Sequence, residues 1–268
     1  MAPRAKRRLG QHFLSDPRIL ARIADALASG PDDSVLEIGP GPGGLTAALV
    51  ARAGQVTAIE KDRDMIAALH AKFPTATCIG GDALDTDRYT LAARPRMTDN
   101  VARNIPYNIT SPLIDKALRP PMPAVIVFLV QKEVAERVTA APGTAEYGAL
   151  TVGVQGVARA ERLFTVPAGA FHPKPRVDSA VLRLVPVDQP LVAEAERESF
   201  RRLVVGLFGF RRKQLARGLR EHTGWPPERV SALLRDIALD ERARPEVLTP
   251  PDFARLHRAI VDAAAEGR

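Results

Sequence analysis

An asparagine, a proline and a tyrosine lie close together in the chain at Asn104, Pro106 and Tyr107. The Asn104 side-chain oxygen and the Pro106 backbone carbonyl are neighbouring acceptors, and an exocyclic amine carries two N–H donors that suit them. The Tyr107 ring offers a flat face to the base that bears the amine. Pro106 stiffens the backbone, so its carbonyl can be aimed. The pattern indicates a site for an aromatic amine, although an asparagine-capped turn with a buried tyrosine would use the same residues.

Such a site could perform methyl transfer. An aromatic amine is a poor nucleophile because its lone pair is delocalised into the ring. Two acceptors that hold its hydrogens can draw the nitrogen towards tetrahedral geometry, so that the pair can attack a sulfonium methyl placed in line. Positioning then supplies most of the rate, and no strong base is needed. The N-x-P-Y arrangement resembles the fourth motif of methyltransferases that act on adenine N6.

A second candidate site is the glycine-rich run that follows an apolar stretch. Gly39, Gly41 and Gly44 satisfy the dinucleotide fingerprint G-x-G-x-x-G. The same run satisfies E-x-G-x-G-x-G with Glu37, Gly39, Gly41 and Gly43, which resembles the first motif of S-adenosylmethionine-dependent methyltransferases. Either pattern predicts a nucleoside cofactor, and a tight strand–helix turn without a ligand is the alternative.

The residues around the glycines narrow the choice of cofactor. Pro40 and Pro42 remove two backbone N–H donors from the loop, and such donors hold a pyrophosphate at a helix N-terminus. The loop therefore favours a cofactor without phosphates, such as S-adenosylmethionine. Glu60 ends the second predicted strand, where a carboxylate can accept from both ribose hydroxyls. Asp82 ends the third and can accept from an adenine amine, unless it only caps a turn.

Alternating strands and helices must position these residues. Apolar runs followed by amphipathic segments predict an α/β fold with a parallel sheet covered on both faces. We predict strands at 34–39, 55–60, 76–82, 99–104 and 124–131, and helices at 15–30, 44–54, 63–73, 110–118 and 132–140. Two further strands, 157–166 and 178–187, flank a proline-rich turn; helices then follow at 195–208, 211–224, 226–237 and 249–265. The domains expected are residues 1–188 and a small all-helical one, 189–268.

Length and composition limit the function. A chain of 268 residues with 46% hydrophobic residues can bury a sizeable core. It lacks an apolar run of the ~20 residues that span a bilayer, and its basic N-terminus has no apolar signal region behind it. The single cysteine, Cys78, excludes an internal disulfide or a cysteine metal cluster. These features predict a cytoplasmic protein. The net charge of +7 favours a nucleic-acid partner, although an arginine-rich composition alone could produce it.

The motifs taken together resemble one family. The runs LGQHFL, VLEIGPGPGGLT, AIEKD, GDAL, NIPYNITSPL, VQKEVAERV, YGALTV and FHPKPRVDSAVLRL follow in this order. They are similar to the ribosomal RNA adenine N6-dimethyltransferases, and most of all to the KsgA (RsmA) type that acts on the small subunit. The resemblance implies a Rossmann-like S-adenosylmethionine-dependent methyltransferase domain with a helical C-terminal domain. The implied reaction is dimethylation of N6 of two adjacent adenosines in a loop near the 3′ end of 16S rRNA.

The resemblance also assigns roles to residues. His12 stands where the family usually has asparagine; because an imidazole can donate or accept a hydrogen bond, we expect that cofactor contact to be kept. Tyr107 would stack on the flipped adenine, whose extrusion exposes its amine, and Phe171 would cover the other face. Asn104 would serve both the cofactor side and the target amine. The implied cofactor contacts are His12, Leu14, Gly39, Gly41, Glu60, Asp82 and Asn104.

Basic clusters complete the expected RNA site. Arg4, Lys6, Arg7 and Arg8 form a tail, and a second cluster lies in the predicted helical domain, where Lys213, Arg217 and Arg220 would share one helix face. We assign both clusters to phosphates of 16S rRNA in the immature small subunit, although a solvated charged surface is the alternative. The histidines show no metal-ligand spacing, the chemistry needs no metal, and a monomer is expected. The second cluster comprises Arg211, Arg212, Lys213, Arg217 and Arg220.

Other functions share parts of the pattern. A large-subunit (23S) rRNA methyltransferase of the macrolide-resistance type would have the same fold and NIPY loop, but the later motifs look closer to the small-subunit type. A DNA adenine methyltransferase would need a larger recognition domain. A non-catalytic RNA-binding or transcription factor would not need the pair of amine acceptors. A nicotinamide oxidoreductase lacks an evident acid for hydride transfer.

Overall fold

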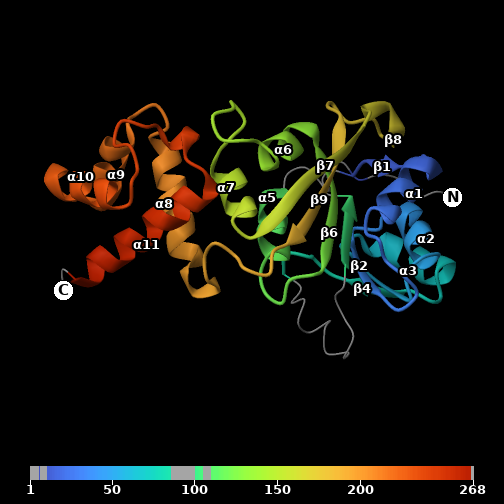
Figure 1. Ribbon diagram of the computed structural model, residues 1–268. Coiled ribbons are helices and arrows are strands. Elements are labelled where there is room, and N and C mark those ends of the chain that lie inside the picture. Colours follow the sequence, from blue (N-terminus) through green and yellow to red (C-terminus); the bar gives the residue numbers. More distant parts are fainter. Residues whose placement is uncertain (1–5, 7–10, 86–99, 105–109, 267–268) are drawn as a thin grey trace. The chain divides into compact units, whose positions relative to one another are not determined.

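The structure is a computed structural model that describes residues 6, 11–85, 100–104 and 110–266 (Figure 1). For residues 100–104 we describe the backbone only. Contacts divide the chain into two compact units. The first unit comprises Met1–Ala135 and Ala160–Pro186, and the second Glu136–Arg159 and Val187–Arg268. The chain enters the second unit for the last time at Val187, near the predicted boundary at 188. The predicted boundary assigns residues 136–159 to the first domain, whereas their contacts place them in the second unit.

One seven-stranded sheet comprises β2 (Ser34–Ile38), β3 (Gln55–Glu60), β4 (Thr77–Gly80), β5 (Asn100–Asn104), β6 (Val125–Gln131), β7 (Ala158–Val166) and β9 (Ser179–Pro186). Its order is β4-β3-β2-β5-β6-β9-β7. Neighbours from β4 to β6 are parallel, whereas β9 runs antiparallel to β6. All five residues of β2 are buried, as expected of a central strand. The α/β fold class is confirmed, with an antiparallel addition to the predicted parallel sheet.

The helices of the first unit include α1 (Pro17–Asp25), α2 (Gly44–Val50), α3 (Arg63–Lys72) and α5 (Thr110–Ala117), and α6 (Lys132–Val138) begins in this unit. Two of them, α1 and α3, begin after an aspartate whose side chain caps them. Asp16 caps α1, where its carboxylate accepts from the N–H groups of Arg18 (2.8 Å) and Ile19 (3.3 Å). The prediction that this helix runs to Gly30 is wrong: it ends at Asp25, and Ala28 adopts a φ of 53° that a continuing helix does not permit.

A second sheet of two short strands was not predicted. β1 (Phe13–Leu14) pairs antiparallel with β8 (Phe171–His172), so that Phe13 lies opposite His172 and Leu14 opposite Phe171. The second of these strands lies inside the run predicted to be a proline-rich turn, which also contains the 3-10 turn η3 (Ala168–Ala170). This pairing brings the N-terminal motif to the FHPKP motif.

The second unit is helical around a core of its own. It contains α7 (Ala149–Gln155), α8 (Arg197–Gly209), α9 (Leu215–Thr223), α10 (Pro227–Asp236) and α11 (Pro250–Glu266), with 3-10 turns η4 (Glu194–Glu196) and η5 (Pro245–Val247). Tyr147 lies in this core, 1% exposed, and its hydroxyl donates to the Leu248 carbonyl at 2.7 Å. The four helices predicted after Pro190 are confirmed, whereas α7 was not predicted.

One feature of the predicted RNA surface is wrong. Lys213 does not share a helix face with Arg217 and Arg220, because α9 begins only at Leu215. Lys213 precedes it in a turn, where its N–H donates to the Phe210 carbonyl at 2.7 Å.

The helices were also compared with what a bilayer requires. Among the residues that the structure describes, none of them combines the length and the hydropathy of a membrane-spanning helix.

Candidate active site

The glycine loop joins β2 to α2 in left-handed backbone conformations. Gly39, Gly41 and Gly43 have φ angles of 70°, 56° and 82°. The Gly39 N–H donates to the Ile59 carbonyl at 2.8 Å, which ties the loop to the end of β3. A Cβ at Gly43 would collide with the Phe73 ring, so that position requires glycine for space as well as for φ.

Glu60 connects the loop to the end of β3. Its Oε2 accepts from the Gly41 N–H at 3.0 Å, and its Oε1 accepts from the Asp62 N–H at 2.8 Å. Glu60 is 6% exposed. The N–H that lies between Pro40 and Pro42 is thus already directed at a carboxylate, and the two prolines have no N–H at all. The loop offers a poor cradle for a phosphate.

Glu37 is a buried carboxyl group in the wall of a pocket. It is 1% exposed, and its Oε2 accepts from the Thr46 hydroxyl at 2.6 Å. Burial raises the pKa of Glu37 to about 7; the Thr46 hydrogen bond opposes this shift and the negative charge of Glu60 adds to it. The group can therefore change its charge near neutral pH.

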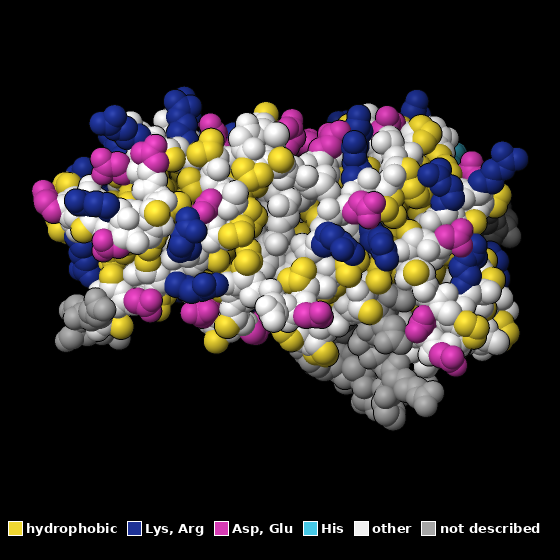
Figure 2. All heavy atoms as spheres, viewed as in Figure 1, with side chains coloured by type: hydrophobic (Ala, Val, Ile, Leu, Met, Phe, Trp, Pro, Cys, Tyr) yellow, Lys and Arg dark blue, Asp and Glu magenta, His cyan; other side chains and the backbone are white. Residues whose placement is uncertain are grey.

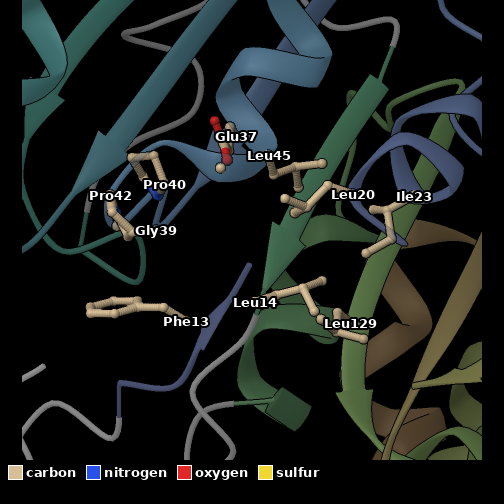
Figure 3. A pocket seen from close by; sticks show the side chains of 12 residues that line it. Phe13, Leu14, Leu20, Ile23, Glu37, Gly39, Pro40, Pro42, Leu45 and Leu129 are labelled. Atoms are coloured by element: carbon tan, nitrogen blue, oxygen red, sulfur yellow. The ribbon is translucent and has the colours of Figure 1, made fainter. Parts of the chain in front are cut away.

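The pocket lies against the glycine loop (Figure 3). Leu14 and Phe13 of β1 lie across it from Pro40 and Pro42. The Phe13 ring approaches the loop so closely that a Cβ at Gly41 would lie 3.1 Å from its Cε1. The structure thus brings together the predicted cofactor contacts Leu14, Gly39 and Gly41.

The pairing of β1 with β8 joins two further predicted site residues. His12 Nδ1 lies 2.7 Å from the Pro173 carbonyl oxygen, so the imidazole ties the N-terminal segment to the FHPKP motif. Phe171, predicted to cover the target base, is 5% exposed and belongs to the hydrophobic core of the first unit with Leu14. Its ring is thus positioned by packing in this structure.

Asp82 lies two residues beyond the end of β4. Its Oδ2 pairs with the Lys61 ammonium at 2.6 Å, and its Oδ1 accepts from the Leu84 N–H at 2.9 Å. Lys61 directly follows Glu60, so the end of β3 positions Asp82 as well as the glycine loop. Asp82 therefore caps a turn, which was the alternative to its proposed contact with adenine. The contact with adenine stays a prediction.

The predicted amine site begins at the end of β5. Asn104 is the last residue of that strand, and its neighbour Arg103 lies opposite Ile38, the residue before the glycine loop. Because parallel strands end at one edge of a sheet, Asn104 begins the loop next to the glycine loop. Pro106 and Tyr107 lie outside the described residues, as do Arg7 and Arg8.

Comparison of this sequence with known proteins identifies its family. A family model described as ribosomal RNA adenine dimethylase matches residues 2–258. The chain belongs to the ribosomal RNA adenine dimethylase family. Ribosomal RNA small subunit methyltransferase A from Geobacter metallireducens is 40% identical over 264 residues, 96% of each chain. The protein of that name from Nitratidesulfovibrio vulgaris is 43% identical over 273 residues, 98% of this chain and 99% of its own.

Solved structures agree with this family and fold. The crystal structure of a dimethyladenosine transferase from Plasmodium falciparum gives a TM-score of 0.81 at 27% identity, covering 96% of this chain and 98% of that one. The crystal structure of the 23S rRNA methyltransferase ErmE gives 0.71 at 30% identity, covering 93% and 99%. The Rossmann-like methyltransferase fold predicted from the motifs is confirmed.

As a ribosomal RNA adenine dimethylase, the chain is an enzyme whose cofactor is S-adenosylmethionine. The described residues fit this cofactor: Gly39 and Gly41, which carry no side chain, line the pocket, and the Gly41 N–H is already directed at the Glu60 carboxylate, so it is not offered to a phosphate. Groups of three or more acidic, histidine or cysteine side chains able to hold a metal are absent from the described part of the chain.

Some site residues were missed by sequence analysis. Phe13 lines the pocket, but a single phenylalanine next to a predicted leucine carries no signal of its own. Lys61 adjoins a predicted ribose acceptor in the run EKD, and this adjacency was a usable signal. Lys6, assigned above to RNA phosphate, lies 2.6 Å from Asp62 and 2.5 Å from Asp64 in this dimethylase.

The basic cluster of the second unit lies at the surface. Figure 2 shows Lys and Arg side chains over the C-terminal helices, with Asp and Glu among them. Arg211 lies 3.3 Å from Glu246, and Lys213 is half-buried with Glu221 at 3.9 Å. The exposed members are Arg211, Arg212, Arg217 and Arg220.

Proposed function

We propose that this enzyme dimethylates N6 of two adjacent adenosines in a loop near the 3′ end of 16S rRNA. The observation that carries the small-subunit target is the near full-length identity of 40–43% to enzymes named for the small subunit. The identity to the 23S enzyme ErmE is 30%. We further propose that the enzyme acts as a cytoplasmic monomer on the immature subunit, and that residues 189–268 form an rRNA-binding domain.

Within that function, the acceptors at the ends of the strands hold the two reactants. Bound S-adenosylmethionine would supply a methyl group on a sulfonium centre. Glu60, fixed by two backbone N–H groups, would accept from ribose hydroxyls with its remaining lone pairs, and Asp82 from the adenine amine of the cofactor. Leu14, Gly39 and Gly41 would line the cofactor pocket beside His12.

Asn104 and the Pro106 carbonyl would hold the hydrogens of the target amine. Tyr107 would stack on the extruded base, and Phe171 would close its other face. The acceptors would orient the amine for attack and draw its nitrogen from planar towards tetrahedral geometry, in which the lone pair can react. These four roles rest on the motif resemblance and on the position of Asn104 at the end of β5.

A methyl-transfer experiment tests the target. The protein is incubated with labelled S-adenosylmethionine and either immature small subunits or protein-free large-subunit rRNA, and the RNA is digested to nucleosides. We expect dimethyladenosine from the small-subunit RNA. Label found only in the large-subunit RNA would establish the 23S alternative instead, and RNA binding without transfer would favour a non-catalytic RNA-binding role.

A further inference from the structure

Three successive residues at the end of β3, Glu60–Asp62, connect separate parts of the first unit. Glu60 bonds to the glycine loop through the Gly41 N–H, and Lys61 pairs with Asp82. Asp62 is the third: its carboxylate lies against the N-terminal segment, where it meets Lys6 and Gln11. The short run Glu60–Asp62 is therefore the place where the N-terminal segment reaches the predicted adenosine site.

The Asp62 carboxylate is buried and fully engaged. Asp62 is 2% exposed; its Oδ1 lies 2.6 Å from the Lys6 ammonium and accepts from the Asp64 N–H at 3.2 Å, and its Oδ2 accepts from the Gln11 amide at 3.3 Å. Burial pushes the pKa of Asp62 upward, but the Lys6 hydrogen bond and the neighbouring N–H donors outweigh it, so the pKa lies below its usual range. A buried charge of this kind depends on its partner.

The same residue holds Glu60 through its backbone. The Asp62 N–H donates to Glu60 Oε1 at 2.8 Å, while Oε2 takes the Gly41 N–H at 3.0 Å. The conformation at Asp62 thus sets one of the two hydrogen bonds that orient the Glu60 carboxylate. Lys6 and Gln11 fix the side chain of that residue, and the Lys6 N–H also donates to Gln11 Oε1 at 2.8 Å.

We propose that Lys6 is a positioning residue for the cofactor: it clamps Asp62 and thereby orients Glu60 towards the cofactor ribose. This inference rests on the proposed role of Glu60 as the ribose acceptor. It replaces the phosphate-binding role that the basic tail suggested for Lys6, because the ammonium group already lies between two carboxylates. The two roles predict different measurements, since a phosphate contact affects only RNA binding.

Calorimetry with S-adenosylhomocysteine, the demethylated cofactor, tests the proposal in the absence of RNA. We expect Lys6→Met to raise the Kd about fivefold or more, as coupled neighbouring groups do, and Lys6→Arg to restore most of the affinity. Steady-state transfer should show a higher KM for S-adenosylmethionine at nearly unchanged kcat. Arg119→Met is the matched control, because it breaks an exposed ion pair of the same unit, that with Asp115 at 2.9 Å; it should bind like the parent.

A double-mutant cycle separates positioning from general loss of structure. If Lys6 acts through Glu60, its replacement should have little further effect in a Glu60→Gln background. Independent effects of the two substitutions, or an unchanged Kd in Lys6→Met, would overturn the proposal. Equal weakening by Arg119→Met would do so too. Because the calorimetric measurements use no RNA, they can succeed or fail whichever rRNA proves to be the substrate.

Discussion

The two units of this chain use their polar residues in opposite ways. In the first unit, acidic side chains at the ends of strands are buried and hydrogen-bonded: Glu37, Glu60 and Asp62 are at most 6% exposed. In the second, the predicted functional residues are exposed arginines on and before α9, above a core of packed apolar side chains. The first arrangement holds hydrogen-bonding groups in fixed positions, and the second places positive charges at the surface.

The difference matches the two tasks that methylation of RNA requires. Transfer depends on atoms held within a fraction of an ångström, which buried hydrogen-bonded groups provide. Attraction to a phosphate backbone depends on the number of positive charges and tolerates mobile side chains. Substitutions in the first unit should therefore affect cofactor binding or transfer, and surface substitutions in the second should affect RNA affinity and its salt dependence.

The largest effect is expected from Asn104→Ala. Removing one of the two proposed amine acceptors should lower kcat about 100-fold or more, as loss of an oriented polar group does in other active sites. RNA binding should stay close to that of the parent, because the exposed basic cluster is intact. Single-turnover transfer and filter binding measure the two quantities. Loss of RNA binding in this variant would show that the loop is structural.

Gly43 and Gly143 allow the steric cost of a Cβ in the cofactor loop to be measured apart from the cost of backbone strain. Gly43 and Gly143 have nearly equal φ angles, 82° and 85°, but a Cβ would collide with Phe73 at the first and meet nothing within 4 Å at the second. We expect Gly143→Ala to cost about 1 kcal/mol from strain alone, and Gly43→Ala about 3 kcal/mol because overpacking is added. Urea denaturation of both variants checks this, and equal costs would refute the steric argument.

The parts predicted correctly from the sequence depend on local signals. The glycine loop and Glu60 follow apolar runs, and their residue types are dictated by the turn and by the strand end. Fold class and family followed from such motifs in order. Phe171 shows the limit: its motif was recognised, but its burial opposite Leu14 was not foreseen. Strands of two residues have no periodicity to detect, and their partners lie far apart in the chain.

Other features were missed because tertiary contacts decide them. α7 is seven residues long and contains Gly153, so neither its length nor its propensity predicts a helix. Ala28, three residues beyond the end of α1, adopts a conformation that alanine rarely adopts. Lys6 looked like one of several tail cations, and only the position of Asp62 distinguishes it.

Glu37 of the first unit responds to pH in the opposite sense to two histidines of the second. The pKa of Glu37 is about 7 in the folded state against 4.5 in its usual range, so the folded protein binds the extra proton between these values. Stability from this group therefore falls as pH rises from about 4.5 to 7. In the second unit, burial lowers the pKa of His222 and His257, so their contribution rises as pH rises towards 6.5.

Glu37→Gln isolates the first of these effects. The amide can still accept from Thr46 but does not ionise, so the variant should gain about 3 kcal/mol relative to the parent above pH 7 and little near pH 4.5. Denaturation of both proteins at several pH values gives the difference, in which the histidine contributions cancel. A difference that does not change with pH would show that the pKa of Glu37 is the same in the folded and unfolded states.

The smallest effect is expected from the exposed arginines of α9. Replacing Arg217 and Arg220 with glutamine should leave the Kd for S-adenosylhomocysteine unchanged, because both side chains are exposed and lie in the second unit. If each contacts a phosphate, RNA affinity should fall and the slope of log K against log salt should decrease by about 0.7 to 0.9 per residue. Arg235→Gln, an exposed arginine on α10 outside the proposed cluster, is the control. An unchanged slope in the double variant would mean that α9 carries a solvated charged face, and that RNA attraction must come from elsewhere in the chain.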